Sequence, residues 1–263
     1  MNRDVVRQIL NVVAVIATLL INSLSQTIPF NGQTSAQIAN RYADRTFFLP
    51  ANYVFSVWGL IYIGMIAFAI FQALPSQREN PRLRRVGYWF VLSCVANGTW
   101  LFLFHYNQFA LSTVAMIVLL GSLLRIYLIL RDGQAISRGE FWCVRVPMSI
   151  YFAWITVATV ANFTYVGVDA NWDGFGIAYE TWGVIMLVVA GLIAAFVAVR
   201  YRDLAYMGVI VWAFVGVAVR HTGVSNVALA AGVMAALVAV GALIAFGMGR
   251  RGGSDSTLTL GRA

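Results

Sequence analysis

Residues 154–162 read Trp-Ile-Thr-Val-Ala-Thr-Val-Ala-Asn, and they lie within an apolar stretch long enough to cross a membrane. The string places an indole nitrogen, two hydroxyls and a carboxamide where lipid offers no hydrogen-bond partner. Each of these groups must find its partner inside the protein or in a cavity. The string therefore predicts a helix whose polar face turns toward other helices or a ligand, and away from lipid.

The composition of the whole chain also indicates a membrane environment. Of its 263 residues, 60% are hydrophobic and 11% are charged, whereas soluble domains carry about 25% charged residues. The apolar residues come in long blocks, unlike the short alternating pattern of β-barrel strands. We therefore predict an all-α, polytopic integral membrane protein in contact with the lipid bilayer. The net charge of +8 does not indicate a nucleic-acid partner, because the basic residues fall at helix ends and in short loops.

Eight segments have the roughly 20 mostly apolar residues that a bilayer-crossing helix needs. They cover residues 5–26, 52–74, 85–105, 109–130, 143–163, 180–199, 203–221 and 225–247. Arg3 and Arg7 precede the first apolar run, as in a signal peptide, but no clear small-x-small cleavage site follows. We interpret this run as a retained first span. Residues 250–263 are expected to form a disordered cytoplasmic tail.

The distribution of arginine predicts the orientation of the chain. All 18 basic residues are arginine, and eight spans place both termini on one side of the membrane. That side holds 15 of the arginines, and the other side holds only Arg41, Arg45 and Arg220. By the positive-inside rule, we expect both termini to be cytoplasmic and the protein to reside in a bacterial inner membrane.

No acidic or basic side chain lies deep in a predicted span. Such a side chain costs about 2.5–3.5 kcal/mol at a helix centre on insertion scales, so it is usually retained for function. The absence argues against a proton-coupled pump and against an intramembrane hydrolase built on carboxylates. His105 and His221 end two spans on the same side. They leave open a pair of axial haem ligands or two interfacial histidines bonded to backbone or water, and we predict no metal site.

Aromatic residues with neutral polar neighbours instead gather at one depth in three spans. At 1.5 Å per residue, Trp58, Trp100 and Trp154 lie roughly 9, 8 and 13 Å below the same membrane surface. This depth is too great for an interfacial aromatic belt. We therefore predict a ligand pocket in the outer leaflet. Its predicted binding residues are Trp58, Tyr62, Asn97, Trp100, Phe104, Tyr151, Trp154, Ala158 and Asn162.

Three motifs in these spans resemble those of the tryptophan-rich sensory proteins, also called the TspO or translocator protein family. The motif residues are Pro50, Val57, Trp58, Tyr62 and Met65 in the second span, Asn97, Trp100 and Phe104 in the third, and Tyr151, Trp154, Thr156, Ala158, Thr159 and Asn162 in the fifth. They fall in the family's order, and the resemblance covers about residues 1–172. In that family, five helices surround a pocket that binds porphyrins, haem-pathway intermediates and sterols, and the long first loop acts as its lid.

The resemblance implies a five-helix ligand-binding bundle over residues 1–172, and residues 173–249 then form a three-helix transmembrane extension. It implies a porphyrin-type tetrapyrrole or a sterol-like ligand, bound for sensing, transport or regulation. No nucleophile–base pair or carboxylate dyad is visible, so we favour a binding protein over an enzyme and predict no catalytic residue. A porphyrin-degrading enzyme and an accessory subunit of a larger membrane complex remain as alternatives. Small residues in the extension predict close packing in a homodimer or with a membrane-protein partner through residues 180–247.

Overall fold

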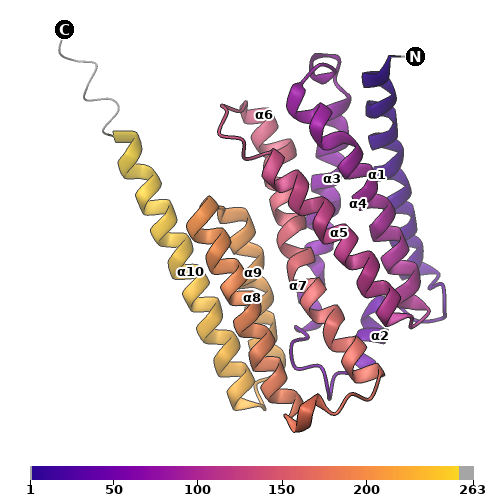
Figure 1. Ribbon diagram of the computed structural model, residues 1–263, viewed down its shortest axis with the longest axis vertical. Helices are drawn as coiled ribbons and strands as arrows, with labels where there is room; N and C mark the ends of the chain where they lie inside the picture. The colour runs from indigo at the N-terminus through magenta and orange to yellow at the C-terminus, as the bar shows by residue number, and fades with distance from the viewer. Residues whose placement is uncertain (1, 255–263) are drawn as a thin grey trace.

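The computed structural model describes residues 2–254, and within this range it contains helices and no strand. Five long helices form the first part of the bundle. They are α1 (Arg3–Thr27), α3 (Val57–Ala73), α4 (Pro81–His105), α5 (Phe109–Ile129) and α7 (Val146–Asp169). Three more helices lie together beside these five (Figure 1): α8 (Tyr179–Tyr201), α9 (Leu204–Arg220) and α10 (Ser225–Ser254). The short helices α2 (Ser35–Arg41) and α6 (Arg138–Glu140) lie in connections.

The predicted all-α membrane fold is confirmed, with one qualification about the number of spans. Seven of the described helices are long and apolar enough to cross a membrane. The remaining predicted span, the seventh in chain order, is α9, a shorter apolar helix of 17 residues. It nevertheless joins the end of α8 to the start of α10, which lie at opposite ends of the bundle (Figure 1). Of the predicted tail, residues 250–254 belong to α10, and residues 255–263 lie outside the described residues.

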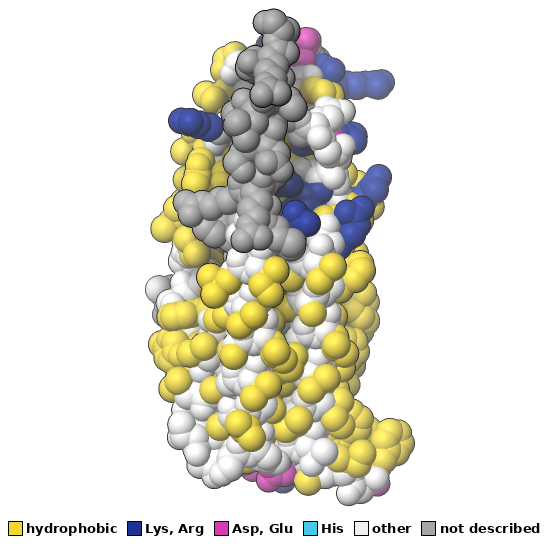
Figure 2. Space-filling model, turned by 90° about the vertical axis from the view of Figure 1, so that its left-hand side faces the viewer, with side chains coloured by type: hydrophobic (Ala, Val, Ile, Leu, Met, Phe, Trp, Pro, Cys, Tyr) yellow, Lys and Arg dark blue, Asp and Glu magenta, His cyan; other side chains and the backbone are white. Residues whose placement is uncertain are grey.

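The two ends of the bundle differ in charge. The start of α1 and the end of α10 lie at one end, which we call the terminal end, and α2 lies at the other, which we call the loop end (Figure 1). On the face that Figure 2 displays, most arginine side chains lie toward the terminal end, above a band of hydrophobic side chains. This arrangement agrees with the predicted arginine distribution. The compartment at each end stays a prediction.

Helix α1 turns its polar face inward. Its buried residues are mostly polar: Arg7, Gln8, Asn11, Thr18, Asn22 and Ser25, with Val15 among them. Its exposed large side chains are apolar: Ile9, Leu10, Val13, Ile16, Leu20 and Leu24. Because lipid cannot pair with amides, the polar face must be satisfied by neighbouring helices. Gln8 donates to the carbonyl oxygen of Gln72 at 2.7 Å, and Asn22 donates to Asn97 Oδ1 at 2.9 Å, so α1 is tied to both α3 and α4.

Pro147 shapes the start of α7. Inside a helix, a proline ring clashes with the carbonyl group four residues earlier. The turn that precedes α7, Phe141–Arg145, is a π-helix, and this wider turn accommodates the ring. Pro147 also packs on Gly64 of α3, where an added Cβ would come within 2.8 Å of the Pro147 Cβ. This close approach holds together the two helices that carry Trp58 and Trp154.

The three C-terminal helices join the first five mainly through α9. This helix packs on α7 and on η1 (Asn52–Ser56), the short 3₁₀ turn before α3. At the terminal end, Asp203 caps α9 and forms an ion pair with Arg131, and both side chains are buried, at 7% and 6% exposure. Arg131 also donates to Ser149 Oγ of α7 at 2.9 Å. A buried charge pair therefore fastens α9 to α5 and α7.

We predict that Asp203→Ser destabilises the bundle by about 3 kcal/mol or more, because it leaves the buried guanidinium of Arg131 without a countercharge. Serine keeps the N-cap oxygen, so the loss of charge is separated from the loss of the cap. The measurement is the free energy of unfolding in mixed micelles. Combining Asp203→Ser with Arg131→Met should recover part of the loss. The control is Arg84→Ala, which removes an ion pair from an arginine that is 45% exposed. Equal effects of Asp203→Ser and Arg84→Ala would contradict the assignment.

Candidate functional site

Trp58 lies at the centre of the predicted site. Its ring stacks on Tyr62, with centroids 5.7 Å apart, and on Trp100, with centroids 6.4 Å apart and planes at 20°. Tyr151 and Trp154 meet it edge-on at 6.2 and 6.3 Å. These are the stacked and T-shaped arrangements that aromatic quadrupoles favour. The structure thus brings residues of α3, α4 and α7, which the sequence placed at one depth, into a single aromatic cluster.

A cavity of about 60 Å³ adjoins this aromatic cluster. Six of the nine predicted binding residues line it: Trp58, Trp100, Phe104, Trp154, Ala158 and Asn162. Tyr62, Asn97 and Tyr151 do not line it, although the two tyrosine rings contact Trp58. Pockets for small-molecule ligands usually enclose about 300–1,000 Å³. The site is therefore closed in this structure.

Helix α7 presents a single face to the cavity. Its lining residues recur at helical spacings of three and four: Trp154, Val157, Ala158, Ala161, Asn162 and Tyr165. The same spacing, counted onward from Trp154, would have identified Val157, Ala161 and Tyr165 from the sequence. Thr156 and Thr159 are not on this face. Their hydroxyls donate to carbonyl oxygens of α7 itself, at 2.9 and 2.7 Å, so the partner that lipid cannot supply comes from the same helix.

Asn162 uses its carboxamide to join three helices. Its Oδ1 accepts a hydrogen bond from Trp100 Nε1 at 3.0 Å. Its Nδ2 donates to Thr113 Oγ1 at 2.6 Å and to Ser112 Oγ at 3.0 Å, both on α5. Because both ends of the carboxamide are engaged, Asn162 positions the Trp100 ring. It lines the cavity as predicted, but its carboxamide is not free to bind a polar group of a ligand.

Three hydrogen-bond donors around Trp58 lack an acceptor. Within the described part of the chain, the indole nitrogen of Trp154, the hydroxyl of Tyr151 and Nδ2 of Asn97 are buried without a hydrogen-bond partner. A buried polar group left in this state costs about 1–3 kcal/mol. All three are on predicted site residues, and Trp154 lines the cavity; Tyr165, which also lines it, has a further buried hydroxyl without a partner.

Asn22 of α1 is a site residue that the sequence reasoning missed. It donates to Asn97 Oδ1 at 2.9 Å, and its own Oδ1 accepts from the Tyr62 hydroxyl at 3.1 Å. It therefore fixes two of the predicted residues from outside the three motif helices. The sequence held a signal for it, because Gln8, Asn11, Thr18 and Asn22 recur at helical spacing along α1.

The segment of residues 28–51 covers the cavity. Four of its residues line the cavity wall: Ser35, Ala39, Leu49 and Pro50. His105 Nε2 lies 2.9 Å from Ser35 Oγ, and His221 Nε2 lies 3.1 Å from the carbonyl oxygen of Leu49. Each histidine is thus bonded to this segment, in line with the interfacial role that the sequence left open.

Helix α9 holds the same covering segment from its other side. Arg220 donates to Asn40 Oδ1 at 2.8 Å, and the backbone N–H of Ala51 donates to the carbonyl oxygen of Gly216 at 3.0 Å. A Cβ at Gly216 would overlap the side chain of Val54, so glycine permits this close approach. A helix outside the predicted five-helix bundle therefore contributes to closing the pocket.

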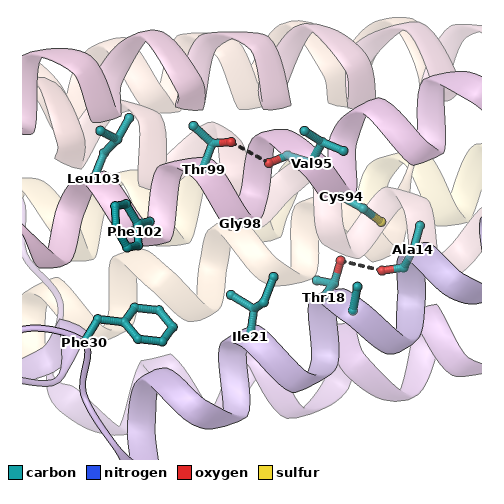
Figure 3. Close-up of a pocket in the computed structure, with 11 residues that line it drawn as sticks. Ala14, Thr18, Ile21, Phe30, Cys94, Val95, Gly98, Thr99, Phe102 and Leu103 are labelled. Atoms are coloured by element: carbon teal, nitrogen blue, oxygen red, sulfur yellow. Dashed lines mark hydrogen bonds between the residues drawn. The ribbon is translucent and has the colours of Figure 1, made fainter.

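A larger groove of about 540 Å³ lies between α1 and α4, and none of the nine predicted residues lines it. Figure 3 shows that its two hydroxyl groups are bonded to their own helices, Thr18 to the Ala14 carbonyl and Thr99 to the Val95 carbonyl, at 2.8 and 2.9 Å. With its polar groups satisfied and its other walls apolar, this groove suits lipid hydrocarbon. It offers no polar group for recognising a specific ligand.

The fold and the closed pocket define a polytopic helical membrane protein with a small aromatic-lined cavity. The model of the TSPO-like protein family matches residues 8–244, and the chain belongs to this family. No curated protein and no solved structure matches the chain. The family match continues well beyond residue 172, where the resemblance in the motifs ends. The three C-terminal helices therefore fall within the family match as far as residue 244, which corrects the view that the resemblance stops before them.

We predict that Asn162→Leu lowers the free energy of unfolding by about 2 kcal/mol. The substitution removes three interhelical hydrogen bonds, and such bonds contribute about 0.6 kcal/mol each in membrane proteins. Unfolding in mixed micelles measures the loss. Thr99→Val is the control, because the Thr99 hydroxyl is exposed and bonds only to its own helix, and it should have little effect. Indistinguishable stabilities of the two variants would refute the positioning role of Asn162.

Proposed function

We propose that this TSPO-like protein binds a flat, amphipathic ligand in the aromatic pocket, for sensing, transport or regulation. The observation that carries the proposal is the unpaired indole donor of Trp154, which lines the aromatic pocket beside Trp58, together with unpaired donors on Tyr151 and Asn97 nearby in α7 and α4. A flat ligand with acceptor atoms on its edge pairs with such donors while its face stacks on the indoles. A tetrapyrrole such as a porphyrin meets both requirements. A sterol offers a flat apolar face and a single hydroxyl.

Binding requires the pocket to open, because about 60 Å³ is far below the volume of a ligand site. The covering segment is held partly by polar contacts to the end of α9, namely those of His221 and Arg220. Breaking these contacts releases the segment without disturbing the packing between the long helices. In this proposal, the structure corresponds to the closed form of the protein. The arginine distribution supports an orientation in which the loop end, and with it the pocket entrance, faces away from the cytoplasm.

A specific observation also favours the second candidate, an accessory role in a larger membrane complex. A groove of about 550 Å³ lies between α9 and α10, and small residues line much of it: Gly232, Ala235, Ala236 and Ala239. Small residues let a further transmembrane helix approach closely. Purification in a mild detergent separates the candidates. A stoichiometric membrane-protein partner supports the accessory role, and an isolated chain contradicts it.

We predict that combining Trp100→Leu with Trp154→Leu weakens the binding of protoporphyrin IX by at least about fivefold. Each substitution removes a stacking or edge contact worth about 0.5–1.5 kcal/mol, and 1.4 kcal/mol corresponds to a factor of ten in affinity. Affinity is measured from the porphyrin absorbance, so the loss of tryptophan fluorescence does not bias the result. The control is Trp142→Leu, which changes a tryptophan that is 65% exposed and outside the pocket. Equal affinities of the double variant and the control would rule out this binding site.

A further inference from the structure

A second cavity, of about 460 Å³, lies between α7 and α8, away from the aromatic pocket. Its volume falls in the range of small-molecule sites, about 300–1,000 Å³. Helix α7 lines it with a face that includes Thr159, Val160 and Phe163, and α8 lines it with a face that includes Met186 and Val189. Helix α8 packs mainly against α10 and only lightly against α7. This uneven packing leaves a cleft between the two helices.

The polar side-chain groups inside the cleft already have hydrogen-bond partners within the protein. Its hydroxyl groups donate to carbonyl oxygens of their own helix, as in Thr156, Thr159 and Thr164 at 2.9, 2.7 and 2.6 Å. Of the described residues that line it, none has a buried polar side-chain atom without a partner. The aromatic pocket differs in this respect, because two of its lining residues, Trp154 and Tyr165, each have a buried donor without a partner. The cleft is therefore suited to hydrocarbon and offers a planar polar ligand nothing to bind.

Charge and aromatic rings are found at the mouth of the cleft, at the loop end. Arg45 lines the cleft, is 47% exposed, and has the adjacent Asp44 carboxylate at 3.9 Å as its only ion-pair partner within the described residues. Trp172 and Trp182 lie in contact there, with ring centroids 5.1 Å apart. Tryptophan favours the level of lipid headgroups, and an arginine at that level attracts an anionic headgroup. The mouth thus combines an anion-binding group with interfacial anchors.

The length of the cleft suits one long chain. Its lining on α8 runs from Tyr179 near the mouth to Ile193, which is about 21 Å along the helix axis at 1.5 Å per residue. Half of a typical bilayer hydrocarbon core is about 15 Å. A chain with its headgroup at the mouth can therefore extend through one leaflet without leaving the cleft.

We propose that this cleft binds a long-chain fatty acid, with the carboxylate at Arg45 and the acyl chain between α7 and α8 as far as Ile193. The proposal stands independently of the aromatic pocket, since no predicted binding residue lines the cleft. Residues of the covering segment, Phe47 and Phe48, contribute to its wall near the mouth. The bound chain therefore contacts the same segment that closes the aromatic pocket.

The test uses the full chain in nanodiscs with a photoactivatable palmitic acid that carries a diazirine near the end of its chain. After illumination, mass spectrometry of peptides should locate the adducts around Met186–Ile193 and on the facing part of α7. An excess of unlabelled palmitate should suppress these adducts. Arg45→Ala should weaken labelling about fivefold, as expected for one interfacial charge. Arg41→Ala, which removes an arginine of the same segment outside the cleft, should leave labelling unchanged, and the matching alcohol probe should not distinguish Arg45→Ala from wild type.

A matched pair of valines tests whether the cleft itself holds the chain. Val189 lines the cleft and its neighbour Val188 does not, and both are 41% exposed. Val189→Trp fills the cleft and should abolish the labelling, whereas Val188→Trp should retain it. Adducts spread evenly over the lipid-exposed helices would overturn the proposal. The proposal would also be overturned if excess palmitate did not reduce the labelling of the wild-type chain. This second test does not depend on the folding of any variant.

Discussion

The structure depends on one constraint, that a polar group within the membrane-spanning bundle must find its hydrogen-bond partner inside the protein. Asn22 and Gln8 meet this requirement by tying α1 to α4 and α3, and Asn162 meets it by joining α7 to α4 and α5. At the terminal end, the buried charges of Arg131 and Asp203 are likewise paired with each other inside the protein. These contacts set which faces of the helices meet, and apolar packing fills the space between them.

The same constraint gives the aromatic pocket its significance. In and near this pocket, the donors of Trp154, Tyr151, Asn97 and Tyr165 are left unpaired. Buried donors without a partner are rare in native structures and call for an explanation, and the one we propose is a ligand that supplies the acceptor. The pocket is also closed by contributions from two parts of the chain, because the segment of residues 28–51 is held by His105 of α4 and by Arg220 and His221 at the end of α9. Helix α9 therefore belongs to the same structural unit as the pocket it helps to close.

Much of this arrangement was predictable from single-helix properties of the sequence. Hydropathy located the spans, and the depths of Trp58, Trp100 and Trp154 placed them in one layer. Interactions between helices were not predictable in this way. Asn162 was predicted only as a binding residue, because its contacts with Trp100 and Thr113 depend on the packing of three helices. The 60 Å³ cavity depends on side-chain packing in the same manner. The three motifs could not show that the C-terminal helices belong to the family. Those helices are rich in Val, Ala and Gly and contain none of the motifs.

We propose above all that the unpaired indole N–H of Trp154 donates a hydrogen bond to an acceptor atom of a bound ligand. Nitrogen-15 labelling of the tryptophan indoles makes this directly observable by NMR, with Trp154→Phe assigning the resonance. On addition of protoporphyrin IX, we expect the Trp154 indole N–H resonance to move downfield in a saturable manner, because the indole forms a new hydrogen bond. The resonance of Trp142, which is exposed and outside the pocket, should stay in place. An unchanged Trp154 resonance at saturating porphyrin, or an equal shift of both resonances, would show that the Trp154 indole does not bind the porphyrin.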